Sequence, residues 1–225
     1  MKPSLPTVLS LTAGYVDTAG FLALNGLFTA HVTGNFVMIG DALAHGSSGI
    51  ASKLLALPVF AVAVLVLHYA ALRAAATPAS TLRAMLVAKF VFLVAAAVCA
   101  VRYGSIATPD SFPMIMTRML LVAAMAIQNA AHRIHLASAP PSTLMTGSTT
   151  QIMLDVASLL YGKAPVKPEV VKPRLARVAV AVGAFAVGCG LAAPAFIFLG
   201  MWCFTVPPVL NLVGLALPSG VSKDD

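Results

Sequence analysis

Residues 29–37, TAHVTGNFV, place polar side chains and a glycine between two apolar segments of the chain. A related stretch, STLMTGSTT, follows at residues 142–150, and both stretches contain the pair Thr-Gly. Glycine and clustered polar residues interrupt a regular apolar helix. The sequence therefore predicts two broken helices, one in each half of the chain.

The composition around these breaks is typical of a membrane protein. Of the 225 residues, 60% are hydrophobic and 9% are charged, and the mean hydropathy is +0.94. A soluble domain carries about 25% charged residues because its surface faces water. Apolar runs of about 20 residues match a bilayer core of roughly 30 Å. We therefore expect an all-α, polytopic membrane protein with a single transmembrane domain over residues 1–225.

Charge and cysteine usage exclude several classes of partner. The net charge of +7 comes from basic residues that fall mostly between apolar segments, as in cytoplasmic loops, so we expect no nucleic-acid partner. Asp17 lies inside the first apolar run and no small-residue cleavage site follows it, which favours an uncleaved first span. The cysteines lack metal-ligand spacing, and we expect no metal and no cofactor at Cys99, Cys189 and Cys203.

The hydrophobic pattern predicts six long helices and two short ones. Loops or turns are expected at residues 45–49, 103–113 and 162–172, where Gly, Pro or Lys gather. Pro207-Pro208 should kink the last helix, because proline removes a backbone hydrogen bond. The long helices are expected at about residues 5–24, 54–72, 82–101, 113–136, 175–192 and 195–217, and the short ones at 35–43 and 146–161.

The two halves of the chain, residues 1–104 and 113–217, share one order of features. Each half contains a long helix, a break, a short polar helix and two plain helices. This order predicts a two-fold internal repeat. At offsets of 112 and 113 residues, the alignment pairs Asp17 with Asn129, Thr33-Gly34 with Thr146-Gly147, and Asn35 with Ser148.

Two topologies fit this repeat. If the short helices do not cross the membrane, each half crosses three times and the second half is inverted; otherwise each crosses four times and the halves are parallel. Either way ten Lys and Arg fall inside and three outside, with both termini cytoplasmic, so charge leaves the alternatives open. Residues 34–43 and 147–160 make only about 15 and 21 Å of helix. We therefore favour about six transmembrane helices, two re-entrant half-helices and an inverted repeat.

The breaks predict a binding site. A broken backbone inside a membrane is tolerated only where it is buried in protein or lines a water-filled cavity. Short interrupted segments at the same place in two repeats point to a transporter binding site, and free amides at a helix start favour an anion. A Thr at such a start accepts a hydrogen bond from an amide. The residues expected to bind the solute or an ion are Asp17, His31, Thr33, Gly34, Asn35, Asn129, Thr146, Gly147 and Ser148.

Several of these residues have a structural alternative. Asp17 could bind a proton or cation, or it could form a bridge to His31 or Arg133. Asn129 could bond the solute or cross-link helices, and His31 could relay protons or cap a loop. His132 and His135 share a helix face, but the sequence offers no third metal ligand near them, so no metal is expected.

Four segments of the chain carry a family resemblance, namely GYVDTAGFLAL (14–24), GLFTAHVTGNFVMIG (26–40), IQNAAHRIHL (127–136) and TLMTGSTTQIMLD (143–155). Together they resemble the bacterial YoaK-like membrane family. The resemblance covers nearly the whole chain and implies a multi-pass protein of the bacterial inner membrane with about six helices. It implies no particular substrate or reaction. In that family the second motif usually ends in Asn, where this chain has Ser148, and Val32 stands where Met is common.

We therefore expect a small secondary transporter or channel, with the lipid bilayer and a small solute, an anion being favoured, as its partners. The small-residue spacings Ala184/Gly188 and Ala186/Gly190 permit close helix contact within the chain or in a homodimer. A non-transporting scaffold or assembly factor is the alternative. We do not expect an enzyme, because an intramembrane reaction using Asp17 and His31 would have no nucleophile beside them.

Overall fold

The computed structural model describes residues 4–46, 48–73, 77–104, 108, 110–161 and 167–218, and the regular elements within them are all helices. The all-α prediction is therefore confirmed. The elements are α1 (Leu5–Ala23), α2 (Gly34–His45), α3 (Ile50–Arg73), α4 (Pro78–Tyr103), α5 (Phe112–His135), α6 (Met145–Tyr161), α7 (Pro168–Leu199), the 3-10 helix η1 (Gly200–Thr205) and α8 (Val206–Ala216).

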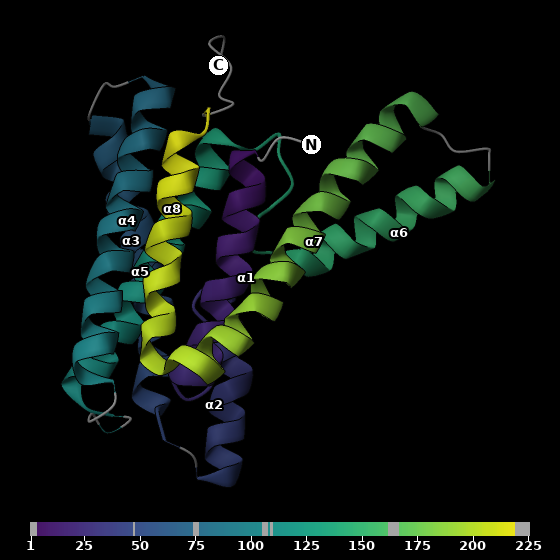
Figure 1. Cartoon of the computed structure of the whole chain (residues 1–225). Coiled ribbons are helices and arrows are strands. Elements are labelled where there is room, and N and C mark those ends of the chain that lie inside the picture. The colour runs from purple at the N-terminus through teal and green to yellow at the C-terminus, as the bar shows by residue number, and fades with distance from the viewer. Residues whose placement is uncertain are drawn as a thin grey trace.

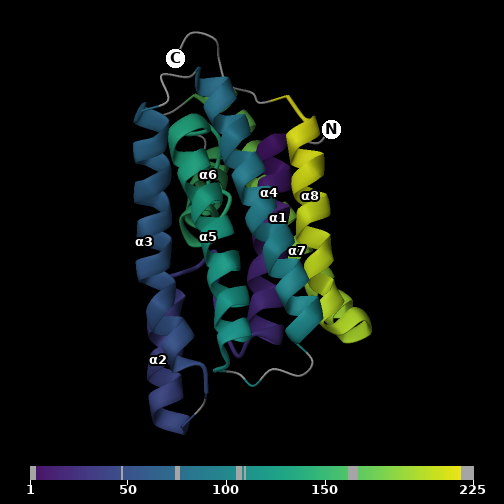
Figure 2. The ribbon, with the colours of Figure 1, turned by 90° about the vertical axis from the view of Figure 1, so that its left-hand side faces the viewer.

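Five helices stand side by side in an upright bundle, formed by α1, α3, α4, α5 and α8 (Figures 1 and 2). The helix α2 extends from one end of this bundle, and α6 leaves it on one side together with the N-terminal part of α7 (Figure 1). The start of α1 and the end of α8 meet at the opposite end from α2, where Leu5 and Leu217 belong to one apolar cluster.

The composition and length of the helices confirm a membrane protein. Within the described residues, four continuous helical segments are long and apolar enough to cross a bilayer: Ile50–Arg73, Pro78–Tyr103, Phe112–His135 and Pro168–Ala216. The last of these combines α7, η1 and α8. Large apolar side chains such as Leu65 and Phe198 are exposed on these helices, at 68% and 82%. Lipid is the solvent in which such exposure is favourable.

Helices α1 and α7 cross in close contact. A Cβ atom on Gly14 would collide with the carbonyl of Phe185, and one on Gly188 would collide with the carbonyl of Leu11. Glycine is therefore required at both positions for the two backbones to approach. One of the predicted small-residue pairs, Ala184 with Gly188, thus serves packing within the chain.

The predicted boundary between the fifth and sixth long helices is wrong. Pro194, expected to lie at that break, is accommodated inside α7. The chain turns at Gly200 instead, where φ is +54°, a backbone conformation that glycine adopts without a steric cost. Pro207 and Pro208 lie in the first turn of α8, so they begin a helix rather than kink one.

All three predicted loops are only partly described, and residue 47 of the first one lies outside the described residues. Residues 168–172, predicted as part of a solvent loop, form the first turn of α7, which starts with a proline at a position where no amide is needed. Residues 162–166 of that loop lie outside the described residues, as do residues 105–107 and 109 of the predicted linker.

The core lies where α1 packs against α4, α5 and η1. Small and branched apolar side chains fill it, which lets the helices approach closely. Cys203 is fully buried there, and Cys99, Cys189 and Cys203 form no disulfide. Other members of the core are Ala13, Val16, Leu93, Ala96, Leu121, Met125 and Phe204.

Candidate functional site

The first break is held by a carboxylate from the preceding helix. Asp17, buried in α1, accepts hydrogen bonds from the backbone amides of Thr29 at 2.7 Å and Ala30 at 2.8 Å. It also accepts one from the Thr29 hydroxyl at 3.2 Å. Among the described residues, no ion pair joins Asp17 to His31 or Arg133. The carboxylate satisfies amides that the broken backbone leaves without helical partners.

Asn35 closes the same loop from the other side. Its Oδ1 accepts from the Phe28 amide at 2.9 Å and its Nδ2 donates to the Phe28 carbonyl at 2.8 Å. Gly34 begins α2, and a Cβ there would lie 3.0 Å from the Phe28 ring. Thr33 precedes the helix without making a side-chain capping bond, so the expected cap is wrong. The Asn35 side chain instead fastens the start of α2 to the preceding loop at Phe28.

The second break is held in a related but weaker way. Asn129, which the sequence alignment of the two halves pairs with Asp17, accepts from the Thr143 hydroxyl at 2.7 Å and donates to the Met125 carbonyl at 3.1 Å. Ser148 donates to the Leu144 carbonyl at 3.3 Å, within its own helix. It therefore does not bridge the break as Asn35 does.

The second Thr-Gly pair does not start its helix. Helix α6 begins at Met145, so Thr146 lies inside its first turn and is not in the position to cap it. Thr146 and Gly147 are both exposed, and no atom lies within 4 Å of where a Gly147 Cβ would stand. The two halves thus use their Thr-Gly pairs differently.

A cavity of about 360 Å³ lies between the two breaks, and we call it the interbreak cavity. It brings together three of the predicted site residues, His31, Thr33 and Asn129. The other predicted site residues do not line it. Its lining is Ala30, His31, Val32 and Thr33 from the first break; Leu57, Phe60, Val64 and His68 from α3; Asn129, Ala130, Arg133 and Ile134 from α5; and Leu144 from the second break.

The charge of the interbreak cavity has one sign. Arg133 and His68 are exposed, and neither side chain makes a hydrogen bond or ion pair with the residues that the structure describes. His31 is half-buried. Of the described residues that line the cavity, none is acidic. An unpaired guanidinium beside two imidazoles favours an anion.

A second cavity, of about 340 Å³, lies beyond His31. Asp17, Thr18 and Phe21 line it from α1, and His31 borders both cavities. The His31 ring meets the edge of Phe28 with centroids 6.3 Å apart. Asp17 therefore faces a different space from Asn129, although both belong to the predicted site.

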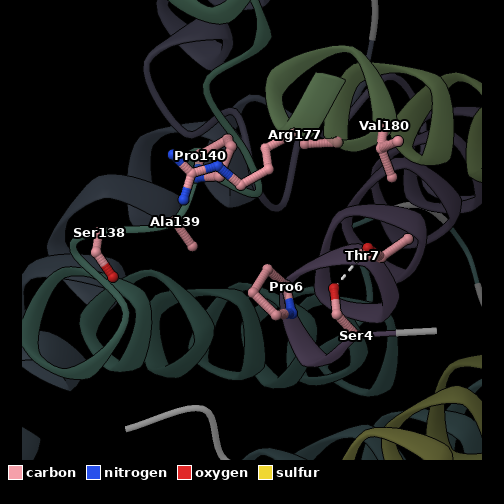
Figure 3. Close-up of a pocket in the computed structure, with 9 residues that line it drawn as sticks. Ser4, Pro6, Thr7, Ser138, Ala139, Pro140, Arg177 and Val180 are labelled. Atoms are coloured by element: carbon pink, nitrogen blue, oxygen red, sulfur yellow. Dashed lines mark hydrogen bonds between the residues drawn. The ribbon is translucent and has the colours of Figure 1, made fainter. Parts of the chain in front are cut away.

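Figure 3 shows a third and smaller cavity, of about 170 Å³, between the start of α1 and α7. Arg177 of α7 and the hydrogen-bonded pair Ser4 and Thr7 lie on opposite sides of it (Figure 3). It contains no predicted site residue. Arg177 is a useful comparison for Arg133, because it is also an exposed arginine at the edge of a cavity.

Lys89 and Arg118 are fully buried and bond other helices or loops, a structural role that the sequence analysis did not predict. The Nζ of Lys89 donates to the Gln128 Oε1 at 2.7 Å. The guanidinium of Arg118 donates to the Ser52 hydroxyl and to the Asn25 Oδ1, both at 2.9 Å. Arg118 is one of the three basic residues that the six-crossing topology places outside the membrane, yet it is fully buried in α5. A charge within a long apolar stretch was the signal that could have marked both residues.

An ion pair joins α6 to α7. Arg174 donates from Nε to Asp155 Oδ2 at 3.0 Å and from Nη2 to Asp155 Oδ1 at 2.5 Å, and Gln151 donates to the same carboxylate at 2.8 Å. The Arg174 guanidinium holds the pKa of Asp155 below its usual value, although burial alone would raise it. Asp155 thus fixes the helix hairpin rather than a ligand.

Comparison with known proteins places the chain among membrane proteins. Residues 5–217 match the family described as protein of unknown function DUF1275. The chain is 31% identical over 222 residues to the UPF0700 transmembrane protein YoaK of Bacillus subtilis (strain 168), a match that covers 96% of this chain and 93% of that protein. No solved structure matches the chain.

Proposed function

Since the chain belongs to the DUF1275 family of YoaK-like membrane proteins, as its paired motifs predicted, we propose that it is a small secondary transporter or channel. The solute binds in the interbreak cavity, and an anion is favoured. The observation that carries this proposal is the presence of residues from both breaks around one cavity that contains an unpaired Arg133. The protein acts in the bacterial inner membrane.

The size and lining of the cavity support a ligand site. Ligand pockets measure roughly 300–1,000 Å³ and combine an apolar lining with a few polar groups. The interbreak cavity, at about 360 Å³, has Arg133, His31, His68, Thr33 and Asn129 as its polar members. Ionisable residues within a membrane protein commonly mark a solute pathway.

The proposal includes six crossings, two re-entrant half-helices, and an inverted repeat of residues 1–104 and 113–217. Support comes from helix direction: α1 and α5 run in opposite directions along the bundle (Figures 1 and 2). At an offset of 112, the α1 positions Asp17, Thr18 and Phe21 in one cavity correspond to the α5 positions Asn129, Ala130 and Arg133 in the other. Both termini are then cytoplasmic.

The proposal also includes a homodimer and no enzymatic turnover. Ala186 and Gly190 are exposed on α7, and no atom lies within 4 Å of where a Gly190 Cβ would stand, which supports a close contact there with a second copy. The Asp17 carboxylate is occupied by three donors, which weighs against its use as a general acid or base.

Solute flux into liposomes tests the transport proposal. The purified protein is reconstituted and assayed with a panel of radiolabelled organic and inorganic anions, together with sugars and amino acids. Val64→Trp fills the interbreak cavity, whereas Val62→Trp places the same bulk on the outer face of the same helix. We expect flux that Val64→Trp abolishes and Val62→Trp leaves intact. Flux unaffected by Val64→Trp would place the pathway elsewhere.

A scaffold or assembly factor is the second candidate. It is favoured because the polar groups of Asp17, Asn35 and Asn129 form hydrogen bonds within the chain. It predicts no flux across the whole panel, together with reproducible recovery of one partner protein. The variant that tests this role is Thr146→Val on the exposed start of α6, which should then reduce partner recovery.

A further inference from the structure

We infer that the interbreak cavity binds an amphipathic monoanion, a single carboxylate or phosphate head on an apolar body. This inference deepens the proposed function and rests on it for the claim that the ligand is carried. The binding itself is argued from the lining alone, namely one unpaired guanidinium set in an otherwise mainly apolar wall.

The polar part of the lining recognises one negative charge. Arg133 presents a planar fork of donors that matches a carboxylate or phosphate in a bidentate manner. Asn129 uses its oxygen and one N–H within the chain, which leaves a second N–H as a donor. His31 and Thr33 add further polar groups. Since no described lining residue is acidic, nothing there pairs with an ammonium group.

The apolar part recognises the body of the ligand. Leu57, Phe60 and Val64 follow one another at helical spacing along α3, opposite Ile134 of α5. An apolar cavity of about 150 Å³ holds benzene. The interbreak cavity, at about 360 Å³, therefore has room for a ring or chain of about twice that size.

The rim of the cavity is itself amphipathic. Leu57, Ile134 and Leu144 are exposed at 37%, 40% and 48%, beside the exposed Arg133. Exposed apolar side chains on a membrane protein face hydrocarbon. A ligand with an anionic head and an apolar body can meet both parts of this rim, whereas a fully hydrated ion meets only one. The same chemistry is found in free fatty acids and in anionic phospholipids.

Binding of radiolabelled octanoate tests the inference. The full chain is placed in nanodiscs of phosphatidylcholine, and octanamide, octylamine and acetate serve as competitors. We expect octanoate to bind, the three competitors to be at least tenfold weaker, and Arg133→Gln to weaken octanoate about tenfold or more. Arg177→Gln, which removes an exposed arginine from the cavity of Figure 3, should leave octanoate binding unchanged.

A second arm separates the two sources of the ligand. Native mass spectrometry is applied after exchange into nanodiscs that contain phosphatidylglycerol. Retention of that lipid by the wild type and by Arg177→Gln, with loss in Arg133→Gln, supports the inference with a phospholipid as the source. Arg133-dependent octanoate binding supports it with a free acid as the source. Binding of both probes that is equal in Arg133→Gln and wild type overturns it.

The outcomes for binding and for transport are distinguishable. Arg133-dependent octanoate binding without octanoate flux supports the ligand class and contradicts transport. Flux of another solute that Val64→Trp abolishes, in a protein that binds neither probe, supports transport and overturns the ligand class. Octanamide binding as tight as octanoate overturns the role of the anionic head.

Discussion

Asp17 and Thr29 are joined by two hydrogen bonds, from the Thr29 backbone amide at 2.7 Å and from its hydroxyl at 3.2 Å to the same carboxylate oxygen. A third donor, the Ala30 amide, reaches that oxygen at 2.8 Å. The first break is thus stabilised by a side chain from the helix that it interrupts. Asp17, which was predicted as a binding residue, thus holds the backbone of the first break in place.

Asp17→Ala should destabilise the protein more than Asp17→Asn. The alanine leaves three buried donors without an acceptor, at a cost of about 1–3 kcal/mol for each donor, whereas asparagine keeps one side-chain oxygen. Thermal unfolding in detergent measures both. Asp41→Ala is the control, because Asp41 is exposed on α2 and, among the described residues, its carboxylate bonds only His45. Equal melting temperatures of Asp17→Ala and Asp41→Ala would contradict the role of Asp17 in holding the first break.

Unchanged solute flux in a folded Asp17→Asn protein would also remove Asp17 from the transport mechanism.

Asn35→Leu should cost more stability than Ser148→Ala, although the predicted repeat pairs the two residues. The leucine leaves both the amide and the carbonyl of Phe28 unpaired, again at about 1–3 kcal/mol each. Ser148 makes one bond, to a carbonyl in its own helix, and its loss should be nearly neutral. Thermal unfolding of the two variants side by side measures the difference, and similar losses would refute the asymmetry between the breaks.

Lys89 and Gln128 should show a coupling energy in a double-mutant cycle. Gln128→Leu leaves the buried Lys89 Nζ without its acceptor, so we expect a loss of about 1.5–3 kcal/mol. Adding Lys89→Met removes the stranded group and should recover part of that loss. Free energies of unfolding in mixed micelles provide the cycle. Gln151→Leu combined with Lys89→Met is the control pair and should be additive, and additivity for Gln128 would count against the contact.

The α6–α7 hairpin should remain closed from neutral pH down to about pH 4. A carboxyl whose folded pKa is lowered stabilises above its unfolded pKa, roughly 3.9, and loses that contribution as the pH falls through the folded value. Spin labels on Leu160→Cys and Val170→Cys report the distance between the two helices. Asp155→Asn should open the hairpin at every pH, and Asp41→Asn should not. Opening of the wild type already complete at pH 6 would contradict the pairing with Arg174.

Cysteines at positions 50 and 106 should both react with an impermeant reagent added from outside the cell. Six crossings place both positions outside, whereas eight crossings place both inside. Ile50 begins α3, and Ile106 lies outside the described residues. Labelling of intact cells, followed by labelling after permeabilisation as the positive control, gives the answer. Protection of both positions until permeabilisation would indicate eight crossings and therefore a parallel repeat.

Composition and short-range patterns were sufficient for the helical class, the membrane environment and most helix boundaries. The start and end of α1, α5 and α6 agree with the prediction to within one residue. Errors fell at Pro194, Pro207 and Pro208, where proline was expected to end or kink a helix. The helices α3, α4 and α7 also start four to seven residues earlier than predicted. A proline is tolerated in a helix where its missing N–H donor is not needed or where neighbouring groups satisfy the carbonyl that it leaves free. The sequence alone does not show where the surrounding chain meets that condition.

The partners of the polar residues could not be deduced from residue types alone. Asp17 and Asn35 have the composition of a binding site, yet their bonds end on backbone groups of the same loop. His68, which was not predicted, joins His31 at the interbreak cavity because one face of α3 packs beside the end of α5. A polar residue in an apolar chain must be satisfied, but the sequence does not indicate whether protein or ligand satisfies it.

Whether a segment forms a helix and whether that helix suits a lipid bilayer depend on residues that are close together in the sequence. Hydropathy and periodicity therefore predict both properties directly. Which residues surround the cavity depends on contacts between distant segments. Arg118 and Asn25, 93 residues apart, and Lys89 and Gln128, 39 apart, bond only because α5 packs against its neighbours. The packing of whole helices therefore decides which charged side chains are bonded inside the protein. It leaves Arg133 at the interbreak cavity without a hydrogen bond or ion pair to the described residues.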